Sequence, residues 1–430
     1  MTTNSFLKCD VCDTRIRLRW QVGKKDVLVS ILCPKCKCAI ECNLHMSPYK
    51  LYAEFDDLQG AKEIDGDDAD YCQEISTEFF VSKMKMQSET SMITPFIRNA
   101  DKIYEKREYI FKIITVSDEV SIYKKELQQI YSLYSNKSFG YMKNKFVASK
   151  DALMFLFKKN IKNASLINDA DYHKYFEEYF KFGLKDIISN DSKASINSIL
   201  NDLNRAISLK RFDMQDFAKK LDDENFYNEL MDKFMKLTIE YLDIFRALVP
   251  LYVEDFDLSD VDLVNNGITT ISYTKLENLY KKCYEFIGHN CLLLIGLNNL
   301  NERGGINNFT NGTKDLFTTV NCCISKYNIF KDNVILGETF SDFFFGCLNN
   351  VVRNSEAHFS TSYDIMTQEV TFTNINTKGI VTITKKYLAE FAKDVAILYF
   401  KCYALWCISS QLNELHYVKN LGLNCKFAMK

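Results

Sequence analysis

The sequence contains few of the residues that interrupt helices. Its 430 residues include only 4 Pro and 15 Gly, against 24 Tyr and 32 Phe. An apolar fraction of 47% and a charged fraction of 26% exclude a mainly disordered chain, a collagen-like fibre and a small disulfide scaffold. We therefore expect long helices around large cores, in two or three domains at about 100–200 residues per domain.

Long apolar runs are missing as well. No stretch approaches 18 consecutive apolar residues, and the strongest candidate, residues 395–408, is interrupted by Lys401. This segment is predicted to be a buried core helix rather than a membrane span. The start of the sequence lacks the apolar core of a secretory signal. These features predict a cytoplasmic protein without a membrane partner, whose cysteines are thiols or metal ligands.

The net charge is close to zero but unevenly distributed. The total of −2, from 54 basic and 56 acidic residues, excludes a uniformly basic nucleic-acid coat protein. Residues 1–48 nevertheless carry eight Lys or Arg and four acidic residues, whereas residues 54–70 carry eight acidic residues and one Lys. The acidic segment is interpreted as a solvated linker.

Six of the 15 cysteines fall within the first 42 residues. Cys9-x2-Cys12 is followed after 20 residues by Cys33-x2-Cys36, which is the spacing of a zinc ribbon. Each C-x2-C turn lets two thiolates point at one centre about 2.3 Å away. The four cysteines are therefore predicted to hold one structural zinc ion in a closed tetrahedral site, with no open position for catalysis.

Three further polar residues follow the second cysteine pair. Cys38, Cys42 and His45 could replace one of the four ligands or hold a second ion. A second ion needs more ligands than these three side chains. We favour one zinc ion, with Cys38, Cys42 and His45 as its neighbours.

The segment between the two cysteine pairs is predicted to be a β-hairpin. Residues 15–20 alternate basic and apolar side chains, residues 23–26 form a turn, and VLVSIL at 27–32 returns. Arg15, Arg17 and Arg19 project from one face of the first strand. Two interpretations of this row stay open: a track for a phosphate backbone, or a solvent face that compensates the negative charge of a zinc–thiolate centre.

The predicted fold class is mainly α. Apolar residues at i, i+3, i+4 and i+7 indicate helices after about residue 78. Two short alternating runs, EVTFTN and GIVTIT, predict a β-hairpin that precedes a last long helix over about 385–416. The predicted parts are a zinc ribbon (1–48), an acidic linker (49–77), an α-helical domain (78–255) and a C-terminal helical bundle with a β-hairpin insertion (256–430).

The chain has only five histidines, so each one is informative. His173 lies among aromatic helix residues and is interpreted as a structural or surface residue. His358 closes the string Arg353-Asn354-Ser355-Glu356-Ala357-His358. This string resembles the R-x4–6-H motif of the HEPN superfamily, including the polar Asn that its ribonuclease members prefer after the Arg. The surroundings resemble the family over about residues 256–420: a helix ends in the motif, and a short hairpin and a long apolar helix follow.

The resemblance implies a HEPN-like bundle and cleavage of RNA without a catalytic metal. The RNA 2′-OH would attack the adjacent phosphate and leave a 2′,3′-cyclic phosphate and a 5′-OH. His358 would transfer protons, Arg353 would hold the phosphate oxygens, and Asn354 would orient either the His or the phosphate. The resemblance also implies a prokaryotic anti-phage defence or toxin effector, controlled by an antitoxin, an activator or a guide RNA. Ser360 stands where some toxins of the family carry a Tyr that is adenylylated.

Helix geometry constrains this site. Arg353 and His358 lie about 140° apart around a straight helix, so they converge within one chain only if the helix ends inside the motif. Otherwise two copies of the motif must face each other. The sequence contains no second R-x4-H string. We therefore predict a homodimer in which Arg353 and His358 of both protomers line one cleft.

Two other classes of function compete with this interpretation. One is a non-catalytic nucleic-acid- or protein-binding module, in which the HEPN-like domain is a dimerisation scaffold, Arg353 caps its helix and His358 is a surface residue. The other is a zinc-dependent hydrolase, which is disfavoured because four thiolates close the metal site and no H-E-x-x-H string is present.

Overall fold

The protein forms two compact units in a computed structural model. The structure describes residues 2–21, 26–46, 53–89, 93–136, 161–162, 169–321, 339–345, 349–357, 360–375, 379–422 and 428–429. Unit 1 comprises Met1–Asp118, Ile244–Leu279 and Asn350–Val395, and unit 2 comprises Glu119–Asp243, Tyr280–Asn349 and Ala396–Lys430. These units differ from the predicted domain boundaries, because each unit combines segments that are distant in the sequence.

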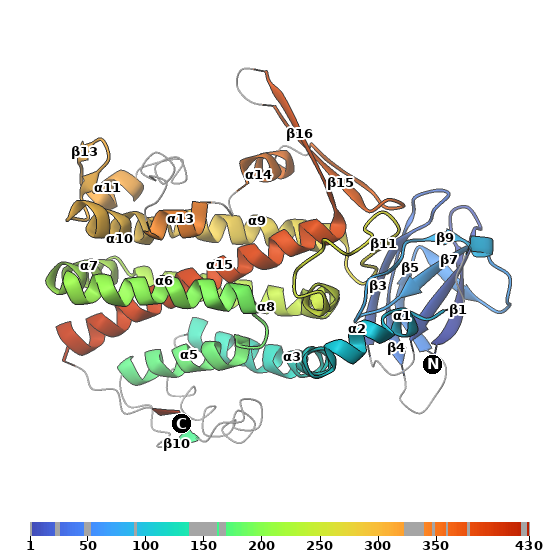
Figure 1. The fold of residues 1–430 in the computed structure, drawn as a ribbon, viewed down its shortest axis with the longest axis horizontal. Coiled ribbons are helices and arrows are strands. Elements are labelled where there is room, and N and C mark those ends of the chain that lie inside the picture. The colour runs from blue at the N-terminus through green and yellow to red at the C-terminus, as the bar shows by residue number, and fades with distance from the viewer. Residues whose placement is uncertain are drawn as a thin grey trace. The chain divides into compact units, whose positions relative to one another are not determined.

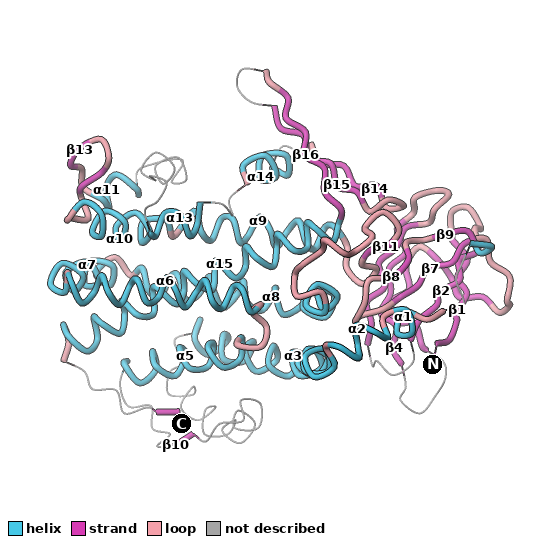
Figure 2. The backbone as a smooth tube through the Cα atoms, in the orientation of Figure 1, coloured by secondary structure: helices cyan, strands magenta, loops and turns pink. Residues whose placement is uncertain are grey.

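Helix predominates over strand, as predicted (Figures 1 and 2). The helices are α1 (Pro95–Arg98), α2 (Ala100–Glu105), α3 (Arg107–Ser135), α5 (Asp169–Leu184), α6 (Asn190–Leu209), α7 (Arg211–Asp223), α8 (Phe226–Val253), α9 (Tyr273–His289), α10 (Cys291–Arg303), α11 (Leu316–Asn321), α13 (Thr339–Phe345), α14 (Asn350–Ala357) and α15 (Leu388–Leu415), with a 3-10 turn η1 (Gln87–Glu89) and a π-helical turn η2 (His416–Asn420). The larger sheets contain β1 (Thr2–Cys9), β2 (Arg15–Gln21), β3 (Asp26–Leu32), β4 (Ala39–Met46), β5 (Ala53–Gln59), β6 (Ala61–Ile64), β7 (Tyr71–Ile75), β9 (Lys85–Met86), β14 (Thr361–Asp364), β15 (Glu369–Ile375) and β16 (Val381–Tyr387). Two-residue strands form three small pairs: β8 (Val81–Ser82) with β11 (Asn266–Gly267), β12 (Asn308–Phe309) with β13 (Gly312–Thr313), and β10 (Ile161–Lys162) with β17 (Ala428–Met429).

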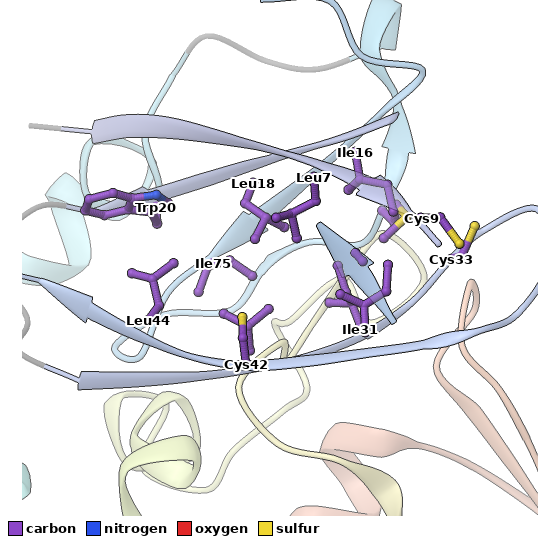
Figure 3. Packing of buried hydrophobic residues seen from close by; sticks show 14 of the residues in the cluster. Leu7, Cys9, Ile16, Leu18, Trp20, Ile31, Cys33, Cys42, Leu44 and Ile75 are labelled. Atoms are coloured by element: carbon purple, nitrogen blue, oxygen red, sulfur yellow. The ribbon is translucent and has the colours of Figure 1, made fainter. Parts of the chain in front are cut away.

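Two sheets enclose the N-terminal core of unit 1. One has the strand order β6-β1-β2-β7-β9 and the other has the order β3-β4-β5. Figure 3 shows their apolar side chains meeting between the strands, with Cys9 and Cys33 together at one end. The predicted apolar face of β2 is confirmed, because Ile16, Leu18 and Trp20 are all buried in this core.

The predicted hairpin between the two cysteine pairs is wrong. β2 and β3 belong to different sheets. Each strand instead pairs across its own cysteine turn, β2 with β1 and β3 with β4, both antiparallel. The alternation of side chains revealed each strand but not its partner, since every C-x2-C turn is itself a reversal of the chain.

The predicted acidic linker contributes strands instead. Wherever the structure describes this segment, it supplies β5, β6 and β7 to the two sheets. Its acids contact the basic N-terminal strands: Asp56 Oδ2 lies 2.6 Å from His45 Nε2, and Asp70 Oδ2 accepts a hydrogen bond from the backbone N–H of Arg15 at 2.9 Å. Arg15 Nη1 also lies 3.7 Å from Asp68 Oδ2, so the basic and acidic segments lie against each other within one folded unit.

The predicted C-terminal hairpin is confirmed and gains a third strand. β15 pairs with β16 from Glu369↔Tyr387 to Ile375↔Val381, and β14 pairs with the other edge of β15. Phe372 of β15 is buried against Phe391 at the start of α15, with ring centroids 5.3 Å apart. Figure 2 shows α14 beside this three-stranded sheet.

The turn between β14 and β15 is fixed to the segment that precedes α9. The Gln368 side chain accepts from the Ile268 N–H at 3.2 Å and donates to the Ile268 carbonyl at 2.9 Å. A Cβ on the neighbouring Gly267 would lie 1.9 Å from Gln368 Oε1, so only glycine leaves room for this amide. The backbone at Gly267 and Ile268 therefore forms a tight receptor for the Gln368 side chain.

Lys83 joins the N-terminal sheets to the same turn. Its buried ammonium donates to the carbonyl of Leu263 at 2.5 Å and to the carbonyl of Thr367, and it lies 4.4 Å from the centroid of the Tyr387 ring. Burial lowers the pKa of Lys83 to about 8. The side chain therefore remains mostly protonated at neutral pH and can donate both hydrogen bonds.

Unit 2 is helical in its described residues, apart from short strand pairs. Tyr399 of α15 stacks on Tyr241 of α8 with centroids 3.8 Å apart, and its hydroxyl donates to Thr238 Oγ1 at 3.1 Å. Trp406 of α15 stacks on Phe234 at 5.2 Å. These rings are buried, as expected for a core built from aromatic residues.

The helix over Leu388–Val418 is long and apolar enough to cross a membrane. Within the fold, 83% of its most apolar window is buried. A core helix passes the same test of length and composition. The prediction of a buried core helix is therefore confirmed.

We predict that Lys83→Met lowers the free energy of unfolding by about 2 kcal/mol, because the buried carbonyl of Leu263 and the carbonyl of Thr367 lose their donor. Urea denaturation monitored by circular dichroism measures this change. Lys62→Met, at an exposed position of β6, is the matched control and should be nearly neutral. Equal stability of the two variants would contradict the role given to Lys83.

Candidate functional site

Two turns of the same geometry carry the four N-terminal cysteines. In the first, the Cys9 N–H donates to the Thr14 carbonyl at 2.9 Å and the Asp13 N–H donates to the Cys9 carbonyl at 3.1 Å. In the second, Cys33 and Lys37 repeat both bonds at 2.8 and 2.9 Å, the former to the carbonyl of Cys38. Asp13 and Lys37 occupy equivalent positions with φ of 60° and 63°. The two turns therefore present their cysteines with the same backbone geometry.

The four cysteine sulfurs converge on one point. Cys9, Cys12, Cys33 and Cys36 place their Sγ atoms within 4.8 Å of one another. Cys9 Sγ lies 3.5 Å from Cys36 Sγ, and Cys12 Sγ lies 3.4 Å from Cys33 Sγ, well beyond the length of a disulfide bond. A tetrahedral zinc ion with Zn–S distances of about 2.3 Å separates its sulfurs by about 3.8 Å. The cluster therefore fits a closed tetrathiolate site.

The thiols of the cluster differ: the pKa of Cys36 is raised to about 12, whereas that of Cys12 is lowered. The Thr14 hydroxyl, 3.0 Å from Cys12 Sγ, lowers the pKa of this thiol to about 6 by hydrogen bonding. Metal ligands must be deprotonated, so Cys12 is prepared for binding. When bound, a zinc ion would join the β1–β2 turn to the β3–β4 turn and so tie the two sheets together.

The three neighbouring residues have other contacts. Cys38 Sγ donates to the Ala39 carbonyl at 3.5 Å, and His45 pairs with Asp56. Cys42 is buried in the apolar core, and burial raises the pKa of its thiol to about 12. Among the described residues, the group able to hold a metal contains only the four predicted cysteines. This agrees with the preferred prediction of a single ion.

The basic row on β2 is used largely within the fold. Arg19 is 6% exposed and lies 3.5 Å from Glu74, whose carboxylate also pairs with Arg98. Arg17 donates to Asn4 Oδ1 at 2.8 Å. Arg19 lies beside Glu74 of the parallel strand β7. It is therefore neither part of a phosphate track nor part of a solvent face.

α14 presents the first two residues of the candidate catalytic motif. Its buried side holds Val352 and Ser355, whereas Arg353 is exposed and Asn354 is half-buried. Arg353 Nη1 donates to Asn354 Oδ1 at 3.3 Å. The sequence therefore places a guanidinium in solvent beside an amide. His358, the third predicted residue, lies outside the residues that the structure describes.

Ser360 fixes the end of α14 to β15. Its N–H donates to the Ser355 carbonyl at 2.9 Å, which is a bond characteristic of a helix end. Its hydroxyl reaches the carbonyls of Ser355 at 3.2 Å and Thr373 at 2.5 Å, and its own carbonyl accepts from the Thr373 N–H. In the sequence, Ser360 is informative only because it stands where some toxins carry a Tyr. Its structural role depends on β15, which no local pattern around Ser360 predicts.

Comparisons of the chain with protein-family models, with curated proteins and with solved structures find no match. The function is therefore inferred from the residues themselves.

We predict that the purified protein contains one zinc ion per chain and that Cys33→Ser loses it. Loss should lower the melting temperature by more than about 5 °C, since each kcal/mol shifts Tm by roughly 2–4 °C in domains of this size. Mass spectrometry of metals and thermal denaturation measure the two effects. Cys38→Ser is the matched control and should keep its zinc. Loss of zinc from both variants, or two ions per wild-type chain, would contradict a four-cysteine site.

Proposed function

We propose that the protein is a metal-independent endoribonuclease of the HEPN type, in which Arg353, Asn354 and His358 cleave RNA. Support comes from the end of α14. The N–H and hydroxyl of Ser360 bond to the Ser355 carbonyl of α14, and the hydroxyl also bonds to the Thr373 carbonyl of β15, while Arg353 remains exposed. This arrangement keeps a solvent-facing cation at a fixed position, which binding of a phosphate requires.

The residues divide the chemistry in the following way. The guanidinium of Arg353 binds the non-bridging oxygens of the scissile phosphate and stabilises charge that develops during attack. Asn354 holds the guanidinium through the hydrogen bond already present between them. His358 takes the proton of the 2′-OH and passes a proton to the leaving 5′-oxygen, so that the proton lost by the nucleophile is balanced by the one gained by the 5′-OH product; an imidazole titrates near neutral pH and suits both transfers. The products are a 2′,3′-cyclic phosphate and a 5′-OH.

We also propose a homodimer in which Arg353 and His358 of both protomers line one cleft. Within one chain the two side chains would converge only if the helix ends inside the motif. His358 lies outside the described residues, so the choice between one chain and two rests on experiment. Mixing Arg353→Ala and His358→Ala chains separates the two arrangements, because only a site shared between protomers regains activity.

The biological setting is proposed on the same resemblance. The protein would act in the cytoplasm as a prokaryotic anti-phage defence or toxin effector, held inactive or directed by an antitoxin, an activator or a guide RNA. The competing proposal is a nucleic-acid- or protein-binding module without catalysis. It predicts that RNA or a protein partner binds and that RNA remains intact.

We predict that the wild-type protein cleaves RNA in EDTA while its zinc content stays unchanged. Arg353→Ala and His358→Ala should each reduce the rate at least about 100-fold, the usual contribution of a proton-transfer or charge-stabilising group. Gel analysis of a labelled RNA measures the rates. Arg205→Ala, at an exposed position of α6, is the matched control and should retain full activity. Identical rates for all four proteins would contradict the proposal, and binding without cleavage would favour the binding module.

We predict that Ser360→Ala lowers kcat more than it weakens RNA binding, because the hydrogen bonds of the Ser360 hydroxyl hold α14 against β15 without touching RNA. The free energy of unfolding should fall by about 1 kcal/mol, the usual value of one hydrogen bond. Ser360→Thr keeps the hydroxyl and should restore most of the rate. Ser362→Ala, on exposed β14, is the control. A Ser360→Ala enzyme with unchanged kcat would show that the Ser360 hydrogen bonds do not position the motif.

A further inference from the structure

Unit 2 contains a pocket of about 230 Å³ lined mainly by aromatic rings. Helices α3, α5 and α8, the end of α15 and the π-helical turn η2 each supply part of its wall. The rings are those of Tyr134, Tyr172, Phe176, Tyr227 and Tyr417. A wall assembled from five separate segments around flat side chains suits a flat, apolar ligand.

Two polar side chains stand in this aromatic wall and fix each other's orientation. His173 Nε2 lies 3.0 Å from the Ser410 carbonyl, so this nitrogen carries the proton. His173 Nδ1 then accepts from Asn413 Nδ2 at 3.2 Å. Burial lowers the pKa of His173 to about 4, which keeps the ring neutral at physiological pH. The amide of Asn413 is therefore held with its nitrogen toward His173.

This orientation leaves the Asn413 oxygen as an acceptor without a donor. Asn413 is 7% exposed, and its Oδ1 is buried with no hydrogen-bond partner in the described part of the chain. A buried polar atom without a partner costs about 1–3 kcal/mol. Asn413 lines the pocket, and a ligand N–H group that binds there and uncovers Oδ1 by a small shift of the amide would recover this cost.

The lack of charge on the lining side chains further restricts the class of ligand that the pocket can bind. Tyrosine, phenylalanine, methionine, asparagine and neutral histidine line the pocket, and no charged side chain is among them. Transfer of a full charge into such a site is costly without a counter-charge. The volume lies below the 300–1,000 Å³ typical of pockets for drug-sized ligands. The best fit is a small, neutral, planar heterocycle with an amino group.

We propose that this pocket binds a purine base through its rings and through a hydrogen bond from the exocyclic amino group to Asn413 Oδ1. The base can belong to a free nucleoside or nucleotide or to an unpaired position of RNA, because both present the same edge and faces. The inference is independent of the ribonuclease proposal, since all lining residues belong to unit 2 and the Arg353 segment belongs to unit 1.

Calorimetric titration of the full-length protein tests the pocket with adenosine, purine riboside, cytidine and tetramethylammonium. Adenosine should bind most tightly. Purine riboside lacks the amino group and should bind at least about fivefold more weakly, as expected for loss of about 1 kcal/mol of hydrogen bonding. AMP and a short oligoadenylate distinguish the two sources of the base: a preference for the oligonucleotide identifies RNA, and equal or tighter binding of AMP identifies a free nucleotide.

Two variants assign binding to this pocket. Tyr172→Leu removes one ring and Asn413→Leu removes the acceptor, and each should weaken adenosine binding at least about fivefold. Tyr104→Leu, at a ring that is 87% exposed in unit 1, is the control and should bind normally. Circular dichroism checks folding, and Tyr172→Leu carries the test if Asn413→Leu does not fold. The proposal is overturned by absent adenosine binding, by tighter binding of cytidine or tetramethylammonium, or by unchanged binding in a folded Tyr172→Leu protein.

Discussion

Convergence of four cysteine sulfurs is the constraint on which the arrangement of unit 1 depends. Each cysteine pair lies in a turn that reverses the chain within one sheet, and the two turns belong to different sheets. A metal bound between them would join the sheets at one end, where the apolar core of the N-terminal region begins. Small domains often need a metal or another cross-link in addition to their apolar burial.

A series of contacts leads from these sheets to the Arg353 segment within unit 1. Lys83 follows β8 and donates to Thr367 in the turn between β14 and β15. β15 in turn bonds to Ser360, and Ser360 closes the end of α14 that carries Arg353. Damage to the cysteine site should therefore reach the motif through the strands rather than through direct contact. In this account the N-terminal region is a support for the site and not only a separate recognition module.

Local patterns in the sequence predicted the features that depend on neighbouring residues. The C-x2-C spacing identified the four cysteines whose sulfurs converge, the alternation in β2 identified its buried face, and the alternating runs identified β15 and β16. The same local patterns did not predict which strands pair with each other. β2 pairs with β1 rather than with β3, and the segment predicted as an acidic linker supplies strands beside the basic ones, where Asp68 pairs with Arg15. The aromatic pocket was not predicted either, because its walls come from five segments of the chain. The sequence around His173 does not indicate its contact with Asn413.

The two candidate sites differ in chemistry in a way that fits different tasks. Arg353 is an exposed cation on a fastened helix end and suits a phosphate, whereas the pocket of unit 2 is neutral and aromatic and suits a base. The claim that RNA supplies its own nucleophile is the centre of the functional account. It is tested most directly by a substrate with a single 2′-deoxy nucleotide on the 5′ side of a mapped cleavage position. The account predicts that cleavage stops at that bond while binding and cleavage elsewhere continue. Undiminished cleavage at the 2′-deoxy position would contradict it.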